Sequence, residues 1–411
     1  MTKYDDCVVL NPEKFIKNNV SKAQVRNAFS HPRLPNPHMR LLFVVARCAG
    51  FKTQLKSILK GNKKHLRFEE CLCTSKNMNK TVELPIVKPI YSVYHSQGSA
   101  SAVISSNPSV RNWYLNHAII LSCDNRFLYS DHALDVSVCH SNLDSAPYLD
   151  QRSVNTLYLN GCVHPVIRAM LDDGFYVYYT VIDDYYIKGK FGYGKRHFSH
   201  DGLICGYDQT EKTYSIFAYD ENERYTVFKT PQSGFEAGRK YVKKYGGGVV
   251  GSLCAIRPWD IQYVLNPETV CHNLKEYLHF TVDHFNFDYG APVYGSAVHD
   301  YLALYLWRII DQEADFSALD KRAFKMIYEH KAVMLERLQA IENYLHWEPE
   351  FSTAYSRIVS DAEKLWYRCL YYLQTNRWSV LFQMRDIILQ IGYNEADILK
   401  KVVAKLENAE L

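Results

Sequence analysis

The sequence lacks the features of membrane-bound and secreted proteins. No apolar run reaches the roughly 18 residues that a helix needs to cross a bilayer. The opening stretch, MTKYDDCVVLNPEKF, has no basic segment followed by an apolar one, so it does not resemble a secretory signal peptide. We therefore expect no membrane association.

An excess of charge of one sign is also absent. The chain has 48 Lys and Arg against 44 Asp and Glu, and its net charge is +4. Nucleic-acid binding would need a localised basic stripe, so this balance predicts no nucleic-acid partner. The 11 cysteines are odd in number and irregularly spaced, which favours a reducing compartment over a disulfide framework. These features together predict a cytoplasmic protein.

The motifs of common metal and phosphate sites are missing as well. Cys71 and Cys73, and likewise Cys139 and His140, form tight pairs without the second pair that a structural zinc site needs. The glycine-rich segment YGGGVVGSLCAI (245–256) is not followed by GK[ST], so it is not a Walker-type phosphate loop. We expect no resident metal or cofactor.

What the sequence does have is the composition of a folded protein with several sections. It is 47% hydrophobic and 22% charged over 411 residues, enough for two or three domains. Residues 1–85 form a first section, which the three prolines of HPRLPNPHMR interrupt. Strand-like runs such as NHAIILSC (116–123) alternate with short helical patches through 86–290, and 291–411 is helical. The predicted class is α+β with a C-terminal helical domain.

An antiparallel meander is predicted near the middle of the chain. Runs of β-branched and aromatic residues, separated by polar turns, occur in HFSHDGLICGYDQTEKTYSIFAYD (197–220) and in the YTVFKT that follows. If the chain folds back at 209–212, His200 lies within about one residue of Asp220 across the ladder. A carboxylate beside an imidazole can orient it as a general base. A shift of one residue in register would instead place the two side chains on opposite faces.

A strand–turn–helix pattern occurs upstream, in IYSVYHSQGSASAVISSN (90–107). The N-terminus of a helix favours an anionic sulfur or an oxyanion, because its free amides and its dipole point there. His95, Ser96, Gln97 and Ser99 lie at this junction, and we consider Ser96 and Gln97 as site residues. The alternative is an ordinary serine-capped helix, which these small residues also satisfy.

The C-terminal section has the periodicity of buried helices. Apolar residues recur there at three- and four-residue steps, as one face of a helix requires: Phe324, Ile327, Met334, Leu338, Ile341 and Leu345. A second helical region runs from 353 to 408, with NRWS and IGYNE as predicted breaks. We also expect HPVIRAMLDDG (164–174) to be a helix that stops at its glycine.

Several of these segments resemble one known family. HSQGSASAVI, the strand end DDYYI, and HDGLICGYD followed by AYD are similar to the papain-like N-terminal family of the butirosin-biosynthesis H protein, and the similarity extends approximately over residues 83–408. This resemblance implies a papain-like (C39-peptidase-like) domain with an antiparallel sheet. It also implies an acyltransferase or amide-forming activity that takes acyl groups from carrier-protein thioesters.

The same resemblance assigns roles to individual residues. His200 matches the family's base, Asp220 matches its orienting carboxylate, and Ser96 falls where the family has its nucleophilic cysteine. A serine hydroxyl is far less ionised than a thiol, so a His–Asp pair tuned for a thiolate activates it less well. Cys123 is the nearest alternative thiol in the sequence. The candidate oxyanion or substrate-binding residues are Gln97, Asp184 and Tyr186.

We therefore predict acyl transfer or amide formation on a carrier-bound thioester, in nonribosomal peptide or related specialised-metabolite biosynthesis. The partners would be an acyl or peptidyl carrier protein and a small-molecule amine. Because the thioester is already activated, no ATP or metal is needed, and phosphopantetheine enters only as the arm of the carrier. Two alternatives stay open: a catalytically inactive papain-like scaffold that binds a biosynthetic partner, and a cysteine-peptidase-type hydrolase.

The C-terminal helices are expected to close the predicted cleft. They carry bulky apolar residues that should pack on one another and on the central domain: Trp366, Trp378, Leu381 and Phe382. Four basic side chains would attract the acidic surface of a carrier protein near the cleft, or else form the solvated side of an amphipathic helix: Lys321, Arg322, Lys325 and Lys331.

Overall fold

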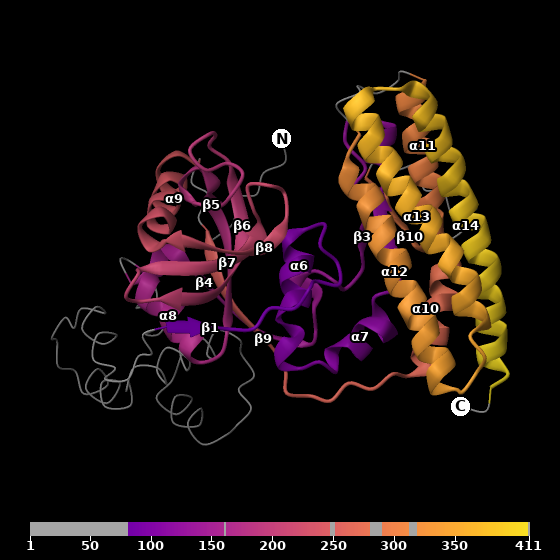
Figure 1. Cartoon of the computed structure of the whole chain (residues 1–411), viewed down its shortest axis with the longest axis horizontal. Coiled ribbons are helices and arrows are strands. Elements are labelled where there is room, and N and C mark those ends of the chain that lie inside the picture. The colour runs from indigo at the N-terminus through magenta and orange to yellow at the C-terminus, as the bar shows by residue number, and fades with distance from the viewer. Residues whose placement is uncertain (1–80, 160–161, 247–250, 280–289, 312–318, 410–411) are drawn as a thin grey trace, which may run out of the picture. The chain divides into compact units, whose positions relative to one another are not determined.

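The structure, a computed structural model, describes residues 81–159, 162–246, 251–279, 290–311 and 319–409 (Figure 1). Residues 78–411 form one compact unit, which includes both predicted sections, 86–290 and 291–411. The predicted N-terminal section, 1–85, lies outside the described residues except for 81–85. No helix within the described ranges is both long and apolar enough to cross a membrane.

A large antiparallel sheet confirms the predicted α+β class. Among the described residues it has seven strands, in the order β4-β9-β5-β6-β7-β8, and β1 pairs with β6 outside this path. Their bounds are β1 Thr81–Glu83, β4 Leu149–Asn155, β5 Tyr176–Asp183, β6 Ser199–Asp208, β7 Thr213–Tyr219, β8 Tyr225–Pro231 and β9 Ser252–Pro258. Since β1 is a strand of this sheet, residues 81–83 belong with it rather than with the predicted N-terminal section.

The predicted meander is confirmed as β6, β7 and β8. The chain turns at 209–212, and Leu203 lies opposite Phe217 in the β6–β7 ladder. The register shifts between Ile204 and Gly206, which marks a β-bulge on β6. Both strands are buried continuously through their middle, which fits their β-branched and aromatic composition.

Two helices pack on the sheet and bury its apolar residues. Helix α8, Val163–Asp172, ends before Gly174, whose φ of 78° only glycine adopts easily, so the predicted helix and its stop are confirmed. Helix α9, Gln232–Tyr245, follows β8 and places Phe235 edge-on against Tyr179 of β5, with ring centroids 5.3 Å apart. Figure 1 shows both helices beside the strands.

A second, small sheet corrects one predicted strand. The run NHAIILSC (116–123) was expected to be a strand, but its first two residues end helix α7, Val110–His117. Only β2, Leu121–Asp124, is extended, and it pairs with β3, Ser137–Val138, and β10, Pro292–Tyr294.

The C-terminal helices agree largely with the predicted pattern. Their bounds are α10 Pro267–His279, α11 Val298–Ile310, α12 Lys321–Tyr344, α13 Glu350–Thr375 and α14 Trp378–Glu407. The predicted apolar face of α12 is buried from Phe324 to Ile341. The break at NRWS is confirmed, because Asn376 adopts a left-handed conformation between α13 and α14.

The break predicted at IGYNE is wrong, because α14 continues through it. Gly392 lies inside this helix, and a Cβ at that position would come 3.1 Å from His299 of α11. The glycine therefore permits a close approach of two helices rather than ending one. Of the bulky residues expected to be buried, Leu381 is buried and the ring of Phe382 is 44% exposed, so the expectation fails for Phe382.

A buried charged network holds the C-terminal helices together. The Lys331 ammonium of α12 lies 2.7 Å from Oε2 of Glu395 on α14, and both side chains are inaccessible to solvent. Tyr277 and Tyr355 donate hydrogen bonds to the same carboxylate. The prediction that Lys331 reaches solvent to dock a partner is therefore wrong: its charge is compensated inside the helix bundle.

Helix α12 also binds the rest of the compact unit. The buried guanidinium of Arg337 donates hydrogen bonds to the carbonyls of Tyr114, Leu115 and Ala118 at the end of α7, where the helix dipole favours a cation. Near its first turn, Lys325 donates to the hydroxyl of Tyr219, 3.1 Å away, at the end of β7. These contacts support the expectation that the helices pack on the central section.

We predict that Glu395→Gln destabilises the fold by about 3–5 kcal/mol, because it leaves the Lys331 ammonium buried without its carboxylate. Asp397→Asn is the matched control, since Asp397 pairs with Lys401 on the exposed side of the same helix. Urea unfolding of both variants measures the difference. Equal losses of unfolding free energy in the two variants would show that the buried pair contributes no more to stability than the exposed pair does.

The same pair predicts a pH dependence. Burial raises the pKa of Glu395, but Lys331 and the histidines 299 and 330 outweigh burial and lower the pKa from 4.5 to about 2. A folded-state pKa below the ordinary value contributes stability above pH 4.5, and this contribution is lost as the pH falls towards about 2. The difference in unfolding free energy between the wild type and Glu395→Gln should therefore shrink in that range.

Candidate active site

Helix α6, His95–Ala102, begins at the site with His95 as its first residue. A Cβ on Gly98 would come 2.4 Å from the ring of Tyr225, so glycine at this position allows α6 to pack closely on β8. The hydroxyl of Tyr225 lies 3.3 Å from the carbonyl oxygen of His95 and donates a hydrogen bond to it. The small residues of HSQGSASA thus allow the start of the helix to lie against the sheet.

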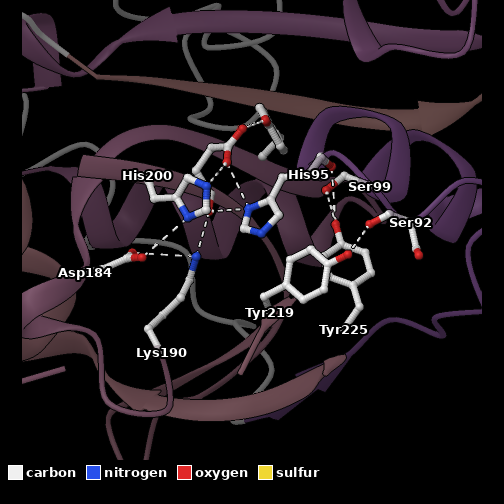
Figure 2. Close-up of polar contacts among 10 residues, drawn as sticks. Ser92, His95, Ser99, Asp184, Lys190, His200, Tyr219 and Tyr225 are labelled. Atoms are coloured by element: carbon white, nitrogen blue, oxygen red, sulfur yellow. Dashed lines mark hydrogen bonds and ion pairs between the residues drawn. The ribbon is translucent and has the colours of Figure 1, made fainter. Parts of the chain in front are cut away.

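His95 is a buried imidazole held at one nitrogen. Its Nδ1 lies 2.9 Å from the carboxylate oxygen Oδ1 of Asp201 and 2.9 Å from the main-chain oxygen of the same residue (Figure 2). Both neighbours are acceptors only, so the proton resides on Nδ1 and the lone pair on Nε2. Nε2 is buried and has no hydrogen-bond partner among the described residues. This is the tautomer and orientation that a general base requires.

Asp201 connects several parts of the site. The hydroxyl of Tyr178 on β5 donates to its second carboxylate oxygen, and the ammonium of Lys190 lies 2.9 Å from its main-chain oxygen. Burial alone would raise the pKa of Asp201, but the hydrogen bonds from His95 and Tyr178 and the charge of His95 outweigh it and hold the pKa below its ordinary value. Asp201 therefore remains a carboxylate over the whole physiological range.

A carboxylate raises the pKa of a neighbouring imidazole on a protein surface, whereas the pKa of His95 is lowered. Burial lowers it first, the Lys190 ammonium lowers it further, and Asp201 only partly compensates. A lowered pKa means that His95 is neutral at neutral pH and able to accept a proton. Burial also lowers the pKa of Lys190, against the opposing effect of Asp184 and Asp201.

His200 lies next to His95, with the centroids of the two rings 4.3 Å apart. Its Nδ1 is 3.4 Å from Asp184, and its Nε2 is 3.8 Å from Asp201, while 38% of its side chain is exposed. A bulge on β5 places it there, because His200 pairs with Ile182 after the register shifts. His200 is thus the part of the site that faces solvent.

Asp220 does not orient His200, so the predicted pairing is corrected. The β6–β7 register, extended by three residues from Leu203, does bring the two residues opposite each other. The carboxylate of Asp220, however, accepts hydrogen bonds from the amides of Asn222 and Arg224, which close the turn after β7. The carboxylate nearest the imidazole of His200 belongs to Asp184.

Ser96 and Gln97 lie on α6 but face other groups. The Ser96 hydroxyl lies 3.2 Å from the side-chain oxygen of Asn142 and donates to it. The buried amide of Gln97 donates to the hydroxyls of Ser137 and Ser141. Neither side chain contacts His200 among the described interactions, so the residue of α6 that meets His200 is His95, one position earlier.

The remaining predicted residues divide between the site and its surroundings. Asp184 belongs to the site through its contacts with His200 and Lys190. Tyr186 lies outside it, beside Tyr185 and Tyr241, on the wall of a surface hollow at the start of α9. Cys123 is buried on β2, and burial raises its pKa, so it is not an activated thiol.

The site could in principle hold a metal ion. Ligand atoms of His95, His200 and Asp201 lie within 4.8 Å of one another, and two imidazoles with a carboxylate form a ligand set for zinc or iron. The ammonium of Lys190 already supplies a positive charge, 2.9 Å from the main-chain oxygen of Asp201. A metal on Nδ1 of His95 would also displace the proton that Asp201 accepts. We therefore interpret this group of residues as an acid–base site.

Sequence reasoning assigned no role to three residues of this site, His95, Asp201 and Lys190, although it placed His95 at the junction before the helix. Two of them are immediate neighbours of predicted residues: His95 precedes Ser96 and Asp201 follows His200. Lys190 belongs to the loop KGKFGYGKR before β6. The available signal was a second histidine–aspartate pair, His95 with Asp201, beside the predicted one.

Comparison with known proteins adds no family to this description. The chain matches no protein-family model and no curated protein. The resemblance stated from the sequence motifs therefore stays a prediction.

We predict that Asp201→Asn lowers the pKa of His95 further, because the negative charge that opposes burial is lost and the amide oxygen is a weaker acceptor than a carboxylate. Asp208→Asn, at the end of β6, is the control and should leave the pKa of His95 unchanged. Titration of the imidazole resonances by NMR measures the shift. An unchanged or raised pKa of His95 in Asp201→Asn would contradict the assigned hydrogen bond.

Proposed function

We propose that the protein transfers an acyl group from a carrier-bound thioester to an amine, with His95 as the general base. The observation that carries this proposal is the state of the His95 imidazole. Its Nδ1 is fixed by Asp201, and its Nε2 is unpartnered. An oriented neutral imidazole removes a proton from an attacking amine. This role replaces the covalent attack predicted for Ser96.

In this mechanism the amine attacks the thioester carbonyl directly. Its proton passes to Nε2 of His95 while the new C–N bond forms, and Asp201 stabilises the imidazolium that results. The C–S bond then breaks, and the proton returns to the departing sulfur. Because the thioester is an activated acyl donor, the balance of atoms and electrons needs no ATP and no redox partner.

The arrangement of elements supports a papain-like fold for this domain. The N-terminus of α6 faces a histidine on the neighbouring antiparallel sheet, and a carboxylate, Asp184, follows the adjacent strand β5. His200, partly exposed at the edge of the site, would then contact the substrate as it enters. Specialised-metabolite biosynthesis, in which carrier proteins present such thioesters, is the proposed setting.

The burial of His95 favours a second candidate function, a papain-like scaffold without catalysis. His95 is only 5% exposed, and the ring centroids of Tyr219, which is stacked, and Tyr225, which is tilted, both lie 5.5 Å from that of its imidazole. A substrate would have to reach Nε2 past these rings. In a scaffold, the same contacts would serve only to hold α6 on the sheet.

We predict that His95→Gln lowers kcat for amide formation by about 10²–10⁴-fold, the usual contribution of a general base. Ser96→Ala should stay within about threefold of the wild type, since a hydroxyl paired with Asn142 takes no part in direct transfer. The assay follows product formation from an acetyl thioester and a panel of amines by mass spectrometry.

His164→Gln is the matched control for replacing a histidine, because His164 lies on α8 and bonds to Tyr214. It should leave kcat unchanged. Accumulation of an acyl adduct on Ser96 would restore the covalent mechanism. Wild-type protein that turns over no thioester would favour the scaffold, and release of free acid without amide would indicate a hydrolase.

A further inference from the structure

The loop before β6 and the end of α9 form an exposed basic surface. We define this basic surface by its cationic side chains, three from the loop 188–198 and three from α9: Lys188, Lys195, Arg196, Lys240, Lys243 and Lys244. All six residues are exposed. A concentration of like charge on two adjacent segments creates a positive potential, although the net charge of the whole chain is only +4.

The two segments are joined by His197 of the loop. Its imidazole stacks on Tyr241 of α9, with ring centroids 4.1 Å apart and planes within 3°. Its Nδ1 lies 2.7 Å from the buried carboxylate of Asp183 at the end of β5. The loop is thereby fixed on the helix and the sheet, so its cations hold a defined arrangement before any partner binds.

These cations are largely without acidic partners of their own. Within the described part of the chain, Lys240 is the member of the basic surface that forms an ion pair, with Glu236. The basic residues of α12, which the sequence suggested for docking, are instead neutralised internally. Lys321 pairs with Glu223, and Arg322 pairs with Asp320. Of these two groups of cations, the one at the loop and α9 is therefore the less compensated.

Two cations of the loop lie against its aromatic rings, which stay partly exposed: Phe191 is 45% and Phe198 is 48% exposed. Lys195 lies over the ring of Phe191, and Arg196 lies between Phe191 and Phe198. A surface that binds single-stranded nucleic acid needs open aromatic faces on which bases stack. The rings alone therefore do not separate an acidic protein from a single strand, and the position of the surface relative to the site decides which partner we propose.

The basic surface borders the site. Phe198 is adjacent to His200, and their ring centroids are 5.2 Å apart. The same loop supplies Lys190, whose ammonium is buried against Asp184 and Asp201. A partner that binds the loop therefore lies next to the exposed edge of the site.

We propose that this basic surface docks an acidic protein, which, if the proposed function holds, is the carrier that delivers the thioester. Charge complementarity at such a surface accelerates encounter and fixes the orientation of the partner. The carrier's arm would then enter beside His200. The docking partner is thus placed at the loop and α9 rather than at α12.

The test uses the full-length protein with two charges reversed, Lys195→Glu and Lys243→Glu. The matched control, Arg357→Glu with Lys400→Glu, changes the net charge equally on exposed positions of α13 and α14. The probe is a fluorescent acidic acyl carrier protein bearing an acetyl thioester, and its Kd is measured at low and high salt. We expect about a tenfold weaker Kd at low salt for the first variant only, a difference that high salt removes.

Turnover of a small acetyl thioester without a carrier separates docking from chemistry. The double variant should keep wild-type kcat/KM on this substrate and lose it on the carrier-bound one. Equal carrier affinity in the variant and the control would overturn the proposed surface, whether or not any thioester is turned over. Tighter binding of single-stranded oligouridylate than of the carrier, abolished by the same variant, would overturn it in favour of nucleic acid.

Discussion

The hydrogen bond between Asp201 and His95 is the interaction on which the site depends. It joins the first residue of α6 to β6, and through the other oxygens of Asp201 it reaches Tyr178 on β5 and Lys190 in the loop. His95, Tyr178 and Lys190 all donate to Asp201. Loss of Asp201 would therefore leave several buried polar groups unsatisfied at once. The same bond selects the tautomer of His95 and so determines what chemistry the site can perform.

The surrounding structure fixes that bond in place and buries its imidazole partner. The glycine at position 98 lets Tyr225 pack against α6, and Tyr219 stacks on His95 from the end of β7. Tyr219 is in turn bonded to Lys325 of α12, whose neighbour Glu329 accepts from the amide of Ser92, 2.7 Å away, just before α6. Helix α12 therefore reaches the site through side chains, while its buried pair with α14 anchors it in the bundle.

The sequence predicted the helices and strands better than the side-chain contacts between them. Period and turn signals located the meander, α8 and the helices from α11 onward, because these depend on local composition. The extrapolated register even aligned His200 with Asp220, yet the Asp220 carboxylate closes its own turn. An aspartate carboxylate that accepts from the amides of its own turn is not available to a distant imidazole, and the residue pattern of a strand does not reveal such bonding.

Choosing between adjacent residues was the harder problem. Ser96 and His95 differ by one helical position, about 100° around the axis, and the choice depends on how α6 rotates against the sheet. That rotation follows from the contact of Gly98 with Tyr225, which lie 127 positions apart in the chain and cannot be paired from local pattern. The break expected at IGYNE failed for a similar reason, since Gly392 responds to His299 on another helix.

The central claim is that the acyl group passes directly to the acceptor, with His95 as base and no covalent enzyme intermediate. Two-substrate initial-rate kinetics test it most directly, with the concentrations of acetyl thioester and amine varied together. Direct transfer requires both substrates on the enzyme at once and predicts double-reciprocal lines that intersect. Parallel lines, the pattern of a ping-pong reaction through an acyl-enzyme, would contradict the account and return the nucleophile to the start of α6.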